Sequence, residues 1–178
     1  MLSGVSQFHF IKEAMMAVMT LQDLFEETLK DLYYVEKKLV KTLPQMAQKA
    51  SSPELRQAID EHLAETETHV ERLEQIFELL DKKATAKTCE ALEGLLREAE
   101  EVTAEISDKP TLDAAIISSA QTVEHYEIAR YGTLACWAAE IGNSEVAELL
   151  EQTLEEEKTA DEKLSELAEA SVNQRAAA

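Results

Sequence analysis

The sequence predicts an all-α fold in which four long helices form a bundle. Glycine and proline, the residues that most disrupt helices, number only 4 and 3 among 178 residues, and aromatic residues make up 5%. Apolar residues recur in alternating steps of three and four along four separate stretches, which is the period of a helix with one buried face. The length suits a single domain with a sizeable core.

The first long helix is predicted to run from residue 20 to about residue 50. Thr20 can cap its N-terminus because Asp23 follows at the third helical position, a pairing that satisfies free backbone amides. Pro44 is expected to kink or weaken the last turns, since proline donates no backbone hydrogen bond. The apolar face consists of Leu24, Thr28, Leu32, Val35, Leu39, Leu43 and Met46.

The stretch SSPE at residues 51–54 predicts the start of the second long helix. It combines a hydroxyl cap, a proline suited to the first turn and an acid near the positive end of the helix. This helix is expected to continue to about Leu80, where the polar segment DKKATAKT ends the pattern. Its apolar face consists of Ile59, Leu63, Thr66, Val70, Leu73, Phe77 and Leu80.

The rest of the chain predicts one short and two long helices. A short connecting helix is expected within residues 89–106. Pro110 is placed to begin the third long helix, which is expected over residues 112–141 and is the most apolar of the four. Gly142 and Asn143 form a stop, and a fourth long helix follows with apolar residues as far as Leu167.

Two short links and one long crossover with a helix of its own define the connectivity. This arrangement is that of a ferritin-like four-helix bundle, and an up-and-down bundle with an accessory helix is the alternative. The bundle domain is expected to span residues 19–170, and residues 171–178 are interpreted as a C-terminal tail. Residues 1–18 differ from the rest and are interpreted as an N-terminal leader or extension with no assigned role.

Acidic residues occupy helix faces where a bundle normally places apolar ones. Projected at 100° per residue, Glu157 and Asp161 share a narrow arc with leucines of the fourth helix. Glu127 lies on the apolar face of the third helix, with Glu124 at its edge. Candidates beside the apolar faces of the first two helices are Glu36, His62, His69 and, farther out, Glu65.

A cluster of buried carboxylates is unfavourable unless protons or cations neutralise it. Basic residues on these faces are too few for pairing, whereas iron and manganese bind carboxylates and imidazoles. A solvated helix face explains each single acid better, so the metal hypothesis depends on pairs on one helix, above all Glu124 with Glu127 and Glu157 with Asp161. We expect two divalent metal ions, iron before manganese, with His62 as an outer partner or alternative ligand.

Four segments carry a resemblance to a known family: DLYYVEKKLVKTLPQMA, HLAETETHVERLEQIFE, AQTVEHYEIARYGTLA and TLEEEKTADEKLSELA. They resemble the YciF/YciE family of ferritin-like bacterial stress proteins, and the likeness covers about residues 19–170. The resemblance implies a ferritin-like bundle with a dinuclear metal centre, a homodimer rather than a cage, and a cellular role in stress.

The resemblance also implies which acids form the centre. They are Glu36, Glu65, Glu124, Glu127, and Glu157 with Asp161. The chain departs from the wider ferritin-like motif Glu-x-x-His, because Thr68 and Ala160 stand where its histidines would be. Glu65 and His69 are instead four residues apart, and Asp161 takes the place that a histidine would hold in the fourth helix.

Charge and cysteine content restrict the partners and the compartment. The chain has 17 Lys and Arg against 36 Asp and Glu, so its net charge of -19 repels nucleic acid and anionic lipid, and neither is expected as a partner. Cys89 and Cys136 form no disulfide framework, which favours a reducing, cytoplasmic location. No run approaches the roughly 18 to 20 apolar residues of a membrane span, and the first residues lack a clear signal-peptide pattern.

Two functions from different classes follow from this pattern. The leading hypothesis is a dinuclear metal protein with Glu36, Glu65, His69, Glu124, Glu127, Glu157 and Asp161 as ligands. Oxygen or peroxide would then react at the site, giving peroxidase or ferroxidase-like activity, and the sequence assigns no electron donor. The alternative is a non-catalytic helical protein of structure or interaction, in which these acids are protonated, hydrated or exposed. A homodimer is expected in preference to a cage-forming iron store.

Overall fold

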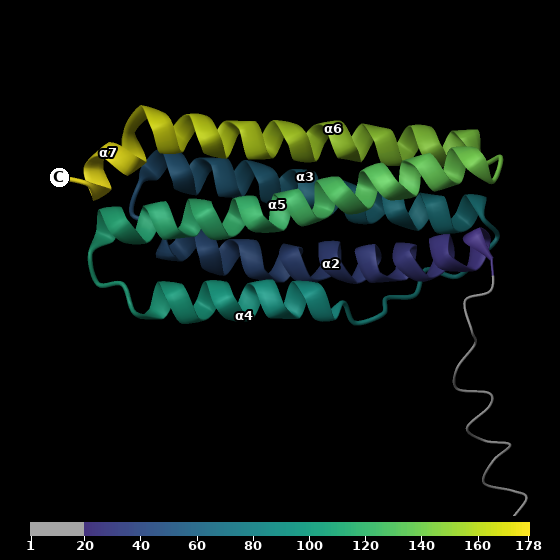
Figure 1. Ribbon diagram of the computed structural model, residues 1–178, viewed down its shortest axis with the longest axis horizontal. Coiled ribbons are helices and arrows are strands. Elements are labelled where there is room, and N and C mark those ends of the chain that lie inside the picture. The colour runs from purple at the N-terminus through teal and green to yellow at the C-terminus, as the bar shows by residue number, and fades with distance from the viewer. Residues whose placement is uncertain (1–19) are drawn as a thin grey trace, which may run out of the picture.

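The computed structural model describes residues 20–178, which form a bundle of long helices and contain no strand (Figure 1). The four long helices are α2 (Leu21–Lys49), α3 (Pro53–Leu79), α5 (Lys109–Glu140) and α6 (Ser144–Leu167). The crossover from α3 to α5 carries the shorter α4 (Glu90–Ala104), which packs along α5 at the edge of the bundle. The predicted all-α, ferritin-like bundle with a helical crossover is therefore confirmed. The expected leader at residues 1–18 lies outside the described residues.

Capping residues set the helix starts. Thr20 and Asp23 form a reciprocal capping box at α2, and the Ser52 hydroxyl accepts a hydrogen bond from the Leu55 amide at α3. α5 begins three residues before the predicted start because Asp108 caps it by accepting from the Thr111 amide. α2 remains helical through Pro44.

The helix ends agree with the stop signals in the sequence. Gly142 has a φ of +86°, a left-handed conformation that glycine adopts without steric cost, and it separates α5 from α6. Beyond α6 the chain continues as a π-helical segment (Ala168–Val172) and a last short helix, α7 (Asn173–Ala176), which packs against α5. Within the segment interpreted as a tail, Val172 is thus part of the core.

Asp113 links the first helical pair to the second. This residue of α5 is buried, and its carboxylate accepts hydrogen bonds from the Ser51 amide (2.6 Å), the Ser51 hydroxyl (2.6 Å) and the Ser52 amide (2.9 Å). The short link between α2 and α3 is therefore held to α5 by one side chain. Because buried amides need partners, this contact fixes the end of the bundle.

Substituting Asp113→Asn should destabilise the protein by about 2 to 3 kcal/mol, because an amide cannot accept all three bonds and buried donors lose their partners. The measurement is urea unfolding followed by circular dichroism. Asp60→Asn, an exposed change on α3, is the matched control and should alter the free energy of unfolding by less than about 0.5 kcal/mol. Equal stability of the two variants would show that the Asp113 contacts contribute nothing.

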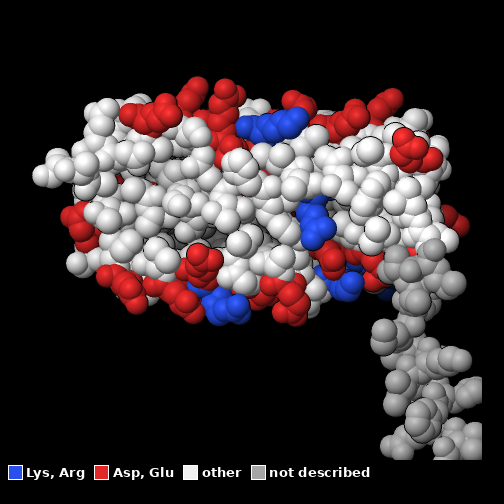
Figure 2. Space-filling view, viewed as in Figure 1, with Lys and Arg blue, Asp and Glu red and all other residues white. Residues whose placement is uncertain are grey.

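Charge is distributed unevenly over the surface. On the face shown in Figure 2, acidic side chains follow the two long edges formed by α6 and α4, whereas the surface over α5 is mostly uncharged. None of the helices described within residues 20–178 combines the length and apolar character needed to cross a membrane.

Candidate metal centre

Six polar side chains from four helices meet in the interior of the bundle. They are Glu36 of α2, His62 and His69 of α3, Glu124 and Glu127 of α5, and Glu157 of α6, and all six are buried. Helical periodicity explains why residues of one helix point to the same site. The two histidines of α3 are seven residues apart, and the two acids of α5 are three residues apart. The sequence thus places one or two ligand-type side chains on the inward face of each long helix.

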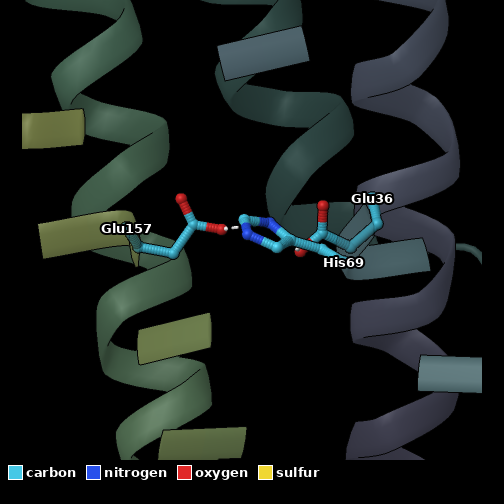
Figure 3. Close-up of side chains that lie close together, drawn as sticks. All are labelled: Glu36, His69 and Glu157. Carbon is cyan, nitrogen blue, oxygen red and sulfur yellow. Dashed lines mark ion pairs between the residues drawn. The ribbon is translucent and has the colours of Figure 1, made fainter. Parts of the chain in front are cut away.

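Five of the six residues, all except Glu127, form two neighbouring sets that share one member. Glu36, His69 and Glu157 bring their ligand atoms within 4.8 Å of one another, as do His62, Glu124 and Glu157. In the first set, His69 Nδ1 lies 3.0 Å from Glu157 Oε1 and 3.5 Å from Glu36 Oε1, so its ring stands between two carboxylates (Figure 3). If each set held a metal ion, Glu157 would be the residue common to both.

Hydrogen bonding within the chain leaves this site unsatisfied. Among residues 20–178, eight buried side-chain nitrogen and oxygen atoms have no hydrogen-bond partner, and all eight belong to these six residues. They include both carboxylate oxygens of Glu127 and of Glu157 and the Nδ1 atoms of both histidines. Buried polar atoms are nearly always bonded in proteins, so this concentration indicates that the site takes up either protons or a bound cation. Four carboxylates and two imidazoles are a donor set that fits two divalent iron or manganese ions.

The pKa values of the acids also indicate a missing positive charge. Burial, followed by the effect of the neighbouring carboxylates, raises the pKa of Glu127 well above 4.5, and burial likewise raises the pKa values of Glu124 and Glu157. Burial alone lowers the pKa of His69, but the Glu157 and Glu36 carboxylates outweigh it and raise that pKa to about 10. The site therefore takes up either protons or metal cations.

The structure leaves two of the sequence-predicted ligands outside this cluster. The Glu65 side chain is 47% exposed and touches only the outer edge of the site, with Oε2 3.5 Å from His62 Nδ1. Asp161 lies one turn beyond Glu157, where it accepts a hydrogen bond from Gln121 at 3.1 Å. His62, which the sequence marked as an outer partner or alternative ligand, instead lies inside the cluster, with Nε2 3.4 Å from Glu124 Oε1.

Sequence reasoning missed a second group of residues that hold the cluster in place. Glu156 accepts hydrogen bonds from both terminal nitrogens of Arg72, at 2.6 and 3.1 Å, and lies 3.0 Å from His69 Nε2. On the other side, the hydroxyl of buried Tyr131 donates to Glu36 Oε1. One signal existed: Arg72 is a charged residue one turn from His69 on the inner face of its helix.

A small cavity of about 30 Å³ adjoins the cluster beside His62 and Glu124. Its walls are mainly apolar and include Leu43, Ile59 and Leu164. A volume of this size holds about one or two water-sized molecules. The cavity volume therefore restricts the space beside the cluster to small molecules.

Comparison with known proteins places the chain in a family. A family model described as "Domain of unknown function (DUF892)" matches residues 20–177. The chain belongs to the DUF892 family. Protein YciF of Escherichia coli K12 is 44% identical to this DUF892 member over 162 residues, which cover 90% of this chain and 98% of YciF. The predicted resemblance to the YciF/YciE family is thus confirmed.

Solved structures of relatives share the fold of this DUF892 protein. The crystal structure of the E. coli stress protein YciF has a TM-score of 0.82 at 44% identity and covers 86% of this chain and 98% of YciF. YcfI of Rhodopseudomonas palustris, described as a candidate structural protein, has a TM-score of 0.83 at 45% identity and covers 84% of this chain and 96% of its own. A protein of Xanthomonas campestris has a TM-score of 0.70 at 26% identity, with 89% and 100% covered.

Proposed function

We propose that this DUF892 protein is a dinuclear metal-binding protein of the bacterial stress response, with iron as the preferred metal and manganese as the alternative. The observation that carries the proposal is the set of eight buried side-chain nitrogen and oxygen atoms, on six converging residues, that have no hydrogen-bond partner within residues 20–178. The stress role is supported by YciF, the E. coli relative described as a stress protein. The donor set supports iron or manganese, since carboxylate oxygens and imidazole nitrogens suit these metals.

The proposed ligands are Glu36, His62, His69, Glu124, Glu127 and Glu157. Glu65 and Asp161, expected as ligands from the sequence, are assigned instead to the surroundings of the site because of their exposure and other contacts. Glu65 lies against His62 and Asp161 is held by Gln121. Neither belongs to the two sets of ligand atoms that lie within 4.8 Å of one another.

An iron pair would supply electrons to a small oxidant such as oxygen or peroxide, which gives a peroxidase or ferroxidase-like activity. The chain's own residues define the conditions for this chemistry. Most of the side chains around the adjoining cavity are apolar, and the cavity volume of about 30 Å³ limits access to small molecules. The Tyr131 hydroxyl orients Glu36 by its hydrogen bond and holds a proton beside the site.

Elemental analysis of protein purified without chelator tests the proposal. We expect close to two iron or manganese ions per chain, and less than about one per two chains would overturn it, because a tight site retains metal by mass action. Anomalous scattering from crystals at the iron and manganese edges then identifies the metal and its ligands in one measurement. Metal bound only at exposed carboxylates would contradict the assignment.

Glu156→Gln should weaken metal binding about 10- to 100-fold, because a ligand histidine depends on the acceptor that fixes its other ring nitrogen. Glu156 lies 3.0 Å from His69 Nε2 and keeps both its oxygens on Arg72. Competition with a coloured chelator measures the affinity. The matched control is Glu155→Gln, which changes an exposed neighbour paired only with Lys158 and should leave affinity unchanged. If the two variants bind metal with equal affinity, Glu156 does not support metal binding through His69.

We also propose that the protein is a homodimer that associates through the outer face of α5. The uncharged surface over α5 supports this assignment, because two copies with a net charge of -19 repel each other least there (Figure 2). Exposed Thr122, Ala129 and Cys136 follow this face at intervals of seven residues. Analytical ultracentrifugation should give a dimer for the natural chain and a monomer for Ala129→Glu. A natural chain that sediments as a monomer contradicts the proposal.

The second candidate function is that of a non-catalytic structural protein. It is favoured by the description of the R. palustris relative YcfI as a candidate structural protein. In this case the buried acids carry protons and no metal is needed for folding. Thermal unfolding with and without iron or manganese separates the two functions, since a ligand that binds only the folded state raises the melting temperature.

A further inference from the structure

A second cavity lies on the opposite side of α2 from the candidate metal centre. It is a groove of about 810 Å³ between the outer face of α2 and α4, and its size is in the range of small-molecule binding sites. The two helices are joined across the groove by side chains rather than by close backbone packing: Tyr34 donates to Glu93 at 2.6 Å, and Lys49 donates to Thr103 at 3.3 Å.

The groove concentrates positive charge in a strongly acidic chain. Lys37, Lys41 and Lys49 project from α2 at multiples of four residues and so form one row, about 18 Å long. Lys38 and Arg97 complete the set, so five of the 17 basic residues of the chain line this one groove. Only two of the 36 acidic residues line it, namely Glu93 and Glu100.

Contacts within the chain pair only some of the basic side chains that line the groove. Lys38 pairs with Glu93 at 2.8 Å, and Lys37 lies over the Tyr33 ring with its Nζ 4.7 Å from the centroid. In contrast, the Lys41 ammonium and the Arg97 guanidinium make no hydrogen bond or close ion pair with any residue in the described range 20–178. Both residues line the groove, Lys41 from α2 and Arg97 from α4, and are available to an anion.

The floor of the groove is apolar. Met46, Leu96 and Ile116 line it beneath the charged rim. A purely inorganic anion would leave these side chains without a partner, whereas a ligand with an apolar ring and a charged tail would contact both surfaces. Lysine and the planar guanidinium of arginine are the preferred partners of phosphate groups.

We propose that the groove between α2 and α4 binds a small organic phosphate of the nucleotide class. The phosphates contact Lys41 and Arg97, and the ring lies on Met46, Leu96 and Ile116. A nucleic acid strand is not the ligand, because the acidic remainder of the surface repels a long polyanion that extends beyond the groove. The site is separate from the metal centre and does not depend on the proposed metal function.

Isothermal titration calorimetry of the full chain, freed of divalent metal, tests the proposal with ATP, pyrophosphate and adenosine as probes. We expect ATP to bind about tenfold or more tightly than either of the others, because only ATP combines charge with a ring. Lys41→Gln with Arg97→Gln should weaken ATP binding by about tenfold or more. Lys158→Gln on α6, which removes a basic residue far from the groove in the sequence and outside its lining, should leave ATP binding unchanged.

Three results would overturn the proposal. The first is ATP binding that is undetectable up to about 1 mM, which leaves no specific site. The second is equal binding of ATP and pyrophosphate, which excludes a role for the apolar floor. The third is a natural chain that is dimeric and binds no ATP, together with a Lys41 and Arg97 double variant that is monomeric. That result would make the groove an interface between copies of the chain. Circular dichroism of each variant shows that it is folded.

Discussion

Replacing Glu157 by glutamine is expected to abolish the metal-dependent rise in melting temperature while leaving the metal-free protein folded. Glu157 belongs to both sets of ligand atoms, so its loss would remove a ligand from each of the two proposed ions. Metal present at about 1,000 times its dissociation constant stabilises the folded state by about 4 kcal/mol. For a chain of this length, that energy corresponds to a rise of about 10 °C or more.

Without metal, the Glu157→Gln variant should not be less stable than the natural chain. In the natural chain without metal, burial penalises the ionised form of the Glu157 carboxyl and raises its pKa, and His69 Nδ1 at 3.0 Å offsets only part of this penalty. A glutamine amide avoids this penalty, so the metal-free variant should be at least as stable at pH 8. Differential scanning calorimetry with and without added iron or manganese measures both effects. A purely structural Glu157 would instead show reduced stability in both conditions.

Glu151→Gln is the matched control for this experiment. It lies on the same helix, α6, and is exposed, so it removes one negative charge without touching the cluster. It should retain the full metal-dependent rise in melting temperature. Loss of the rise in this variant as well would mean that metal acts through the general negative charge of the surface.

The metal-free protein should lose stability as pH rises from about 6 to 9, which reverses the behaviour expected when metal is bound. Burial and neighbouring carboxylates raise the pKa values of Glu124, Glu127 and Glu157 in the folded state. Above their unfolded pKa of 4.5 the folded chain therefore binds more protons than the unfolded chain, and rising pH favours unfolding. His69 acts in the same direction between 6.5 and its folded pKa of about 10.

Metal reverses this dependence because its ligands bind in their deprotonated forms. Loading therefore improves as pH rises, and the loaded protein should not show the same loss. Urea unfolding of both forms at several pH values measures the effect. Glu127→Gln should reduce the pH dependence of the free energy of unfolding of the metal-free protein by up to about 1.4 kcal/mol per pH unit, since it removes one carboxyl group with a raised pKa. A slope that is unchanged in this variant would show that Glu127 does not titrate in the window.

Much of the fold and part of the site could be predicted from helical periodicity. Glu127 and Glu157 occupy positions that the period assigns to the core, so a single helix is enough to mark them as unusual. The helix starts at Thr20 and Ser52 followed from local capping chemistry, which needs no tertiary information. The connectivity followed from the lengths of the links.

The remaining assignments depended on distances that one helix does not contain. A projection down the helix axis places Glu157 and Asp161 in the same arc, but it ignores the rise of one turn that separates them along the axis. Only Glu157 lies at the height of His69. Glu65 is rotated away from the face that His62 and His69 share, and buried Thr66 faces inward instead. Glu156 reaches His69 through its side-chain length rather than its position on the apolar face.

The cluster also constrains how the helices can slide along one another. A shift of α6 by one turn, about 5.4 Å, would carry Glu157 away from both histidines. Other alignments of the helices would leave a buried carboxylate without its partners, which is unfavourable. A core of leucines alone would allow several alignments of similar energy. The acids that weaken the interior thus give these four helices a single longitudinal register.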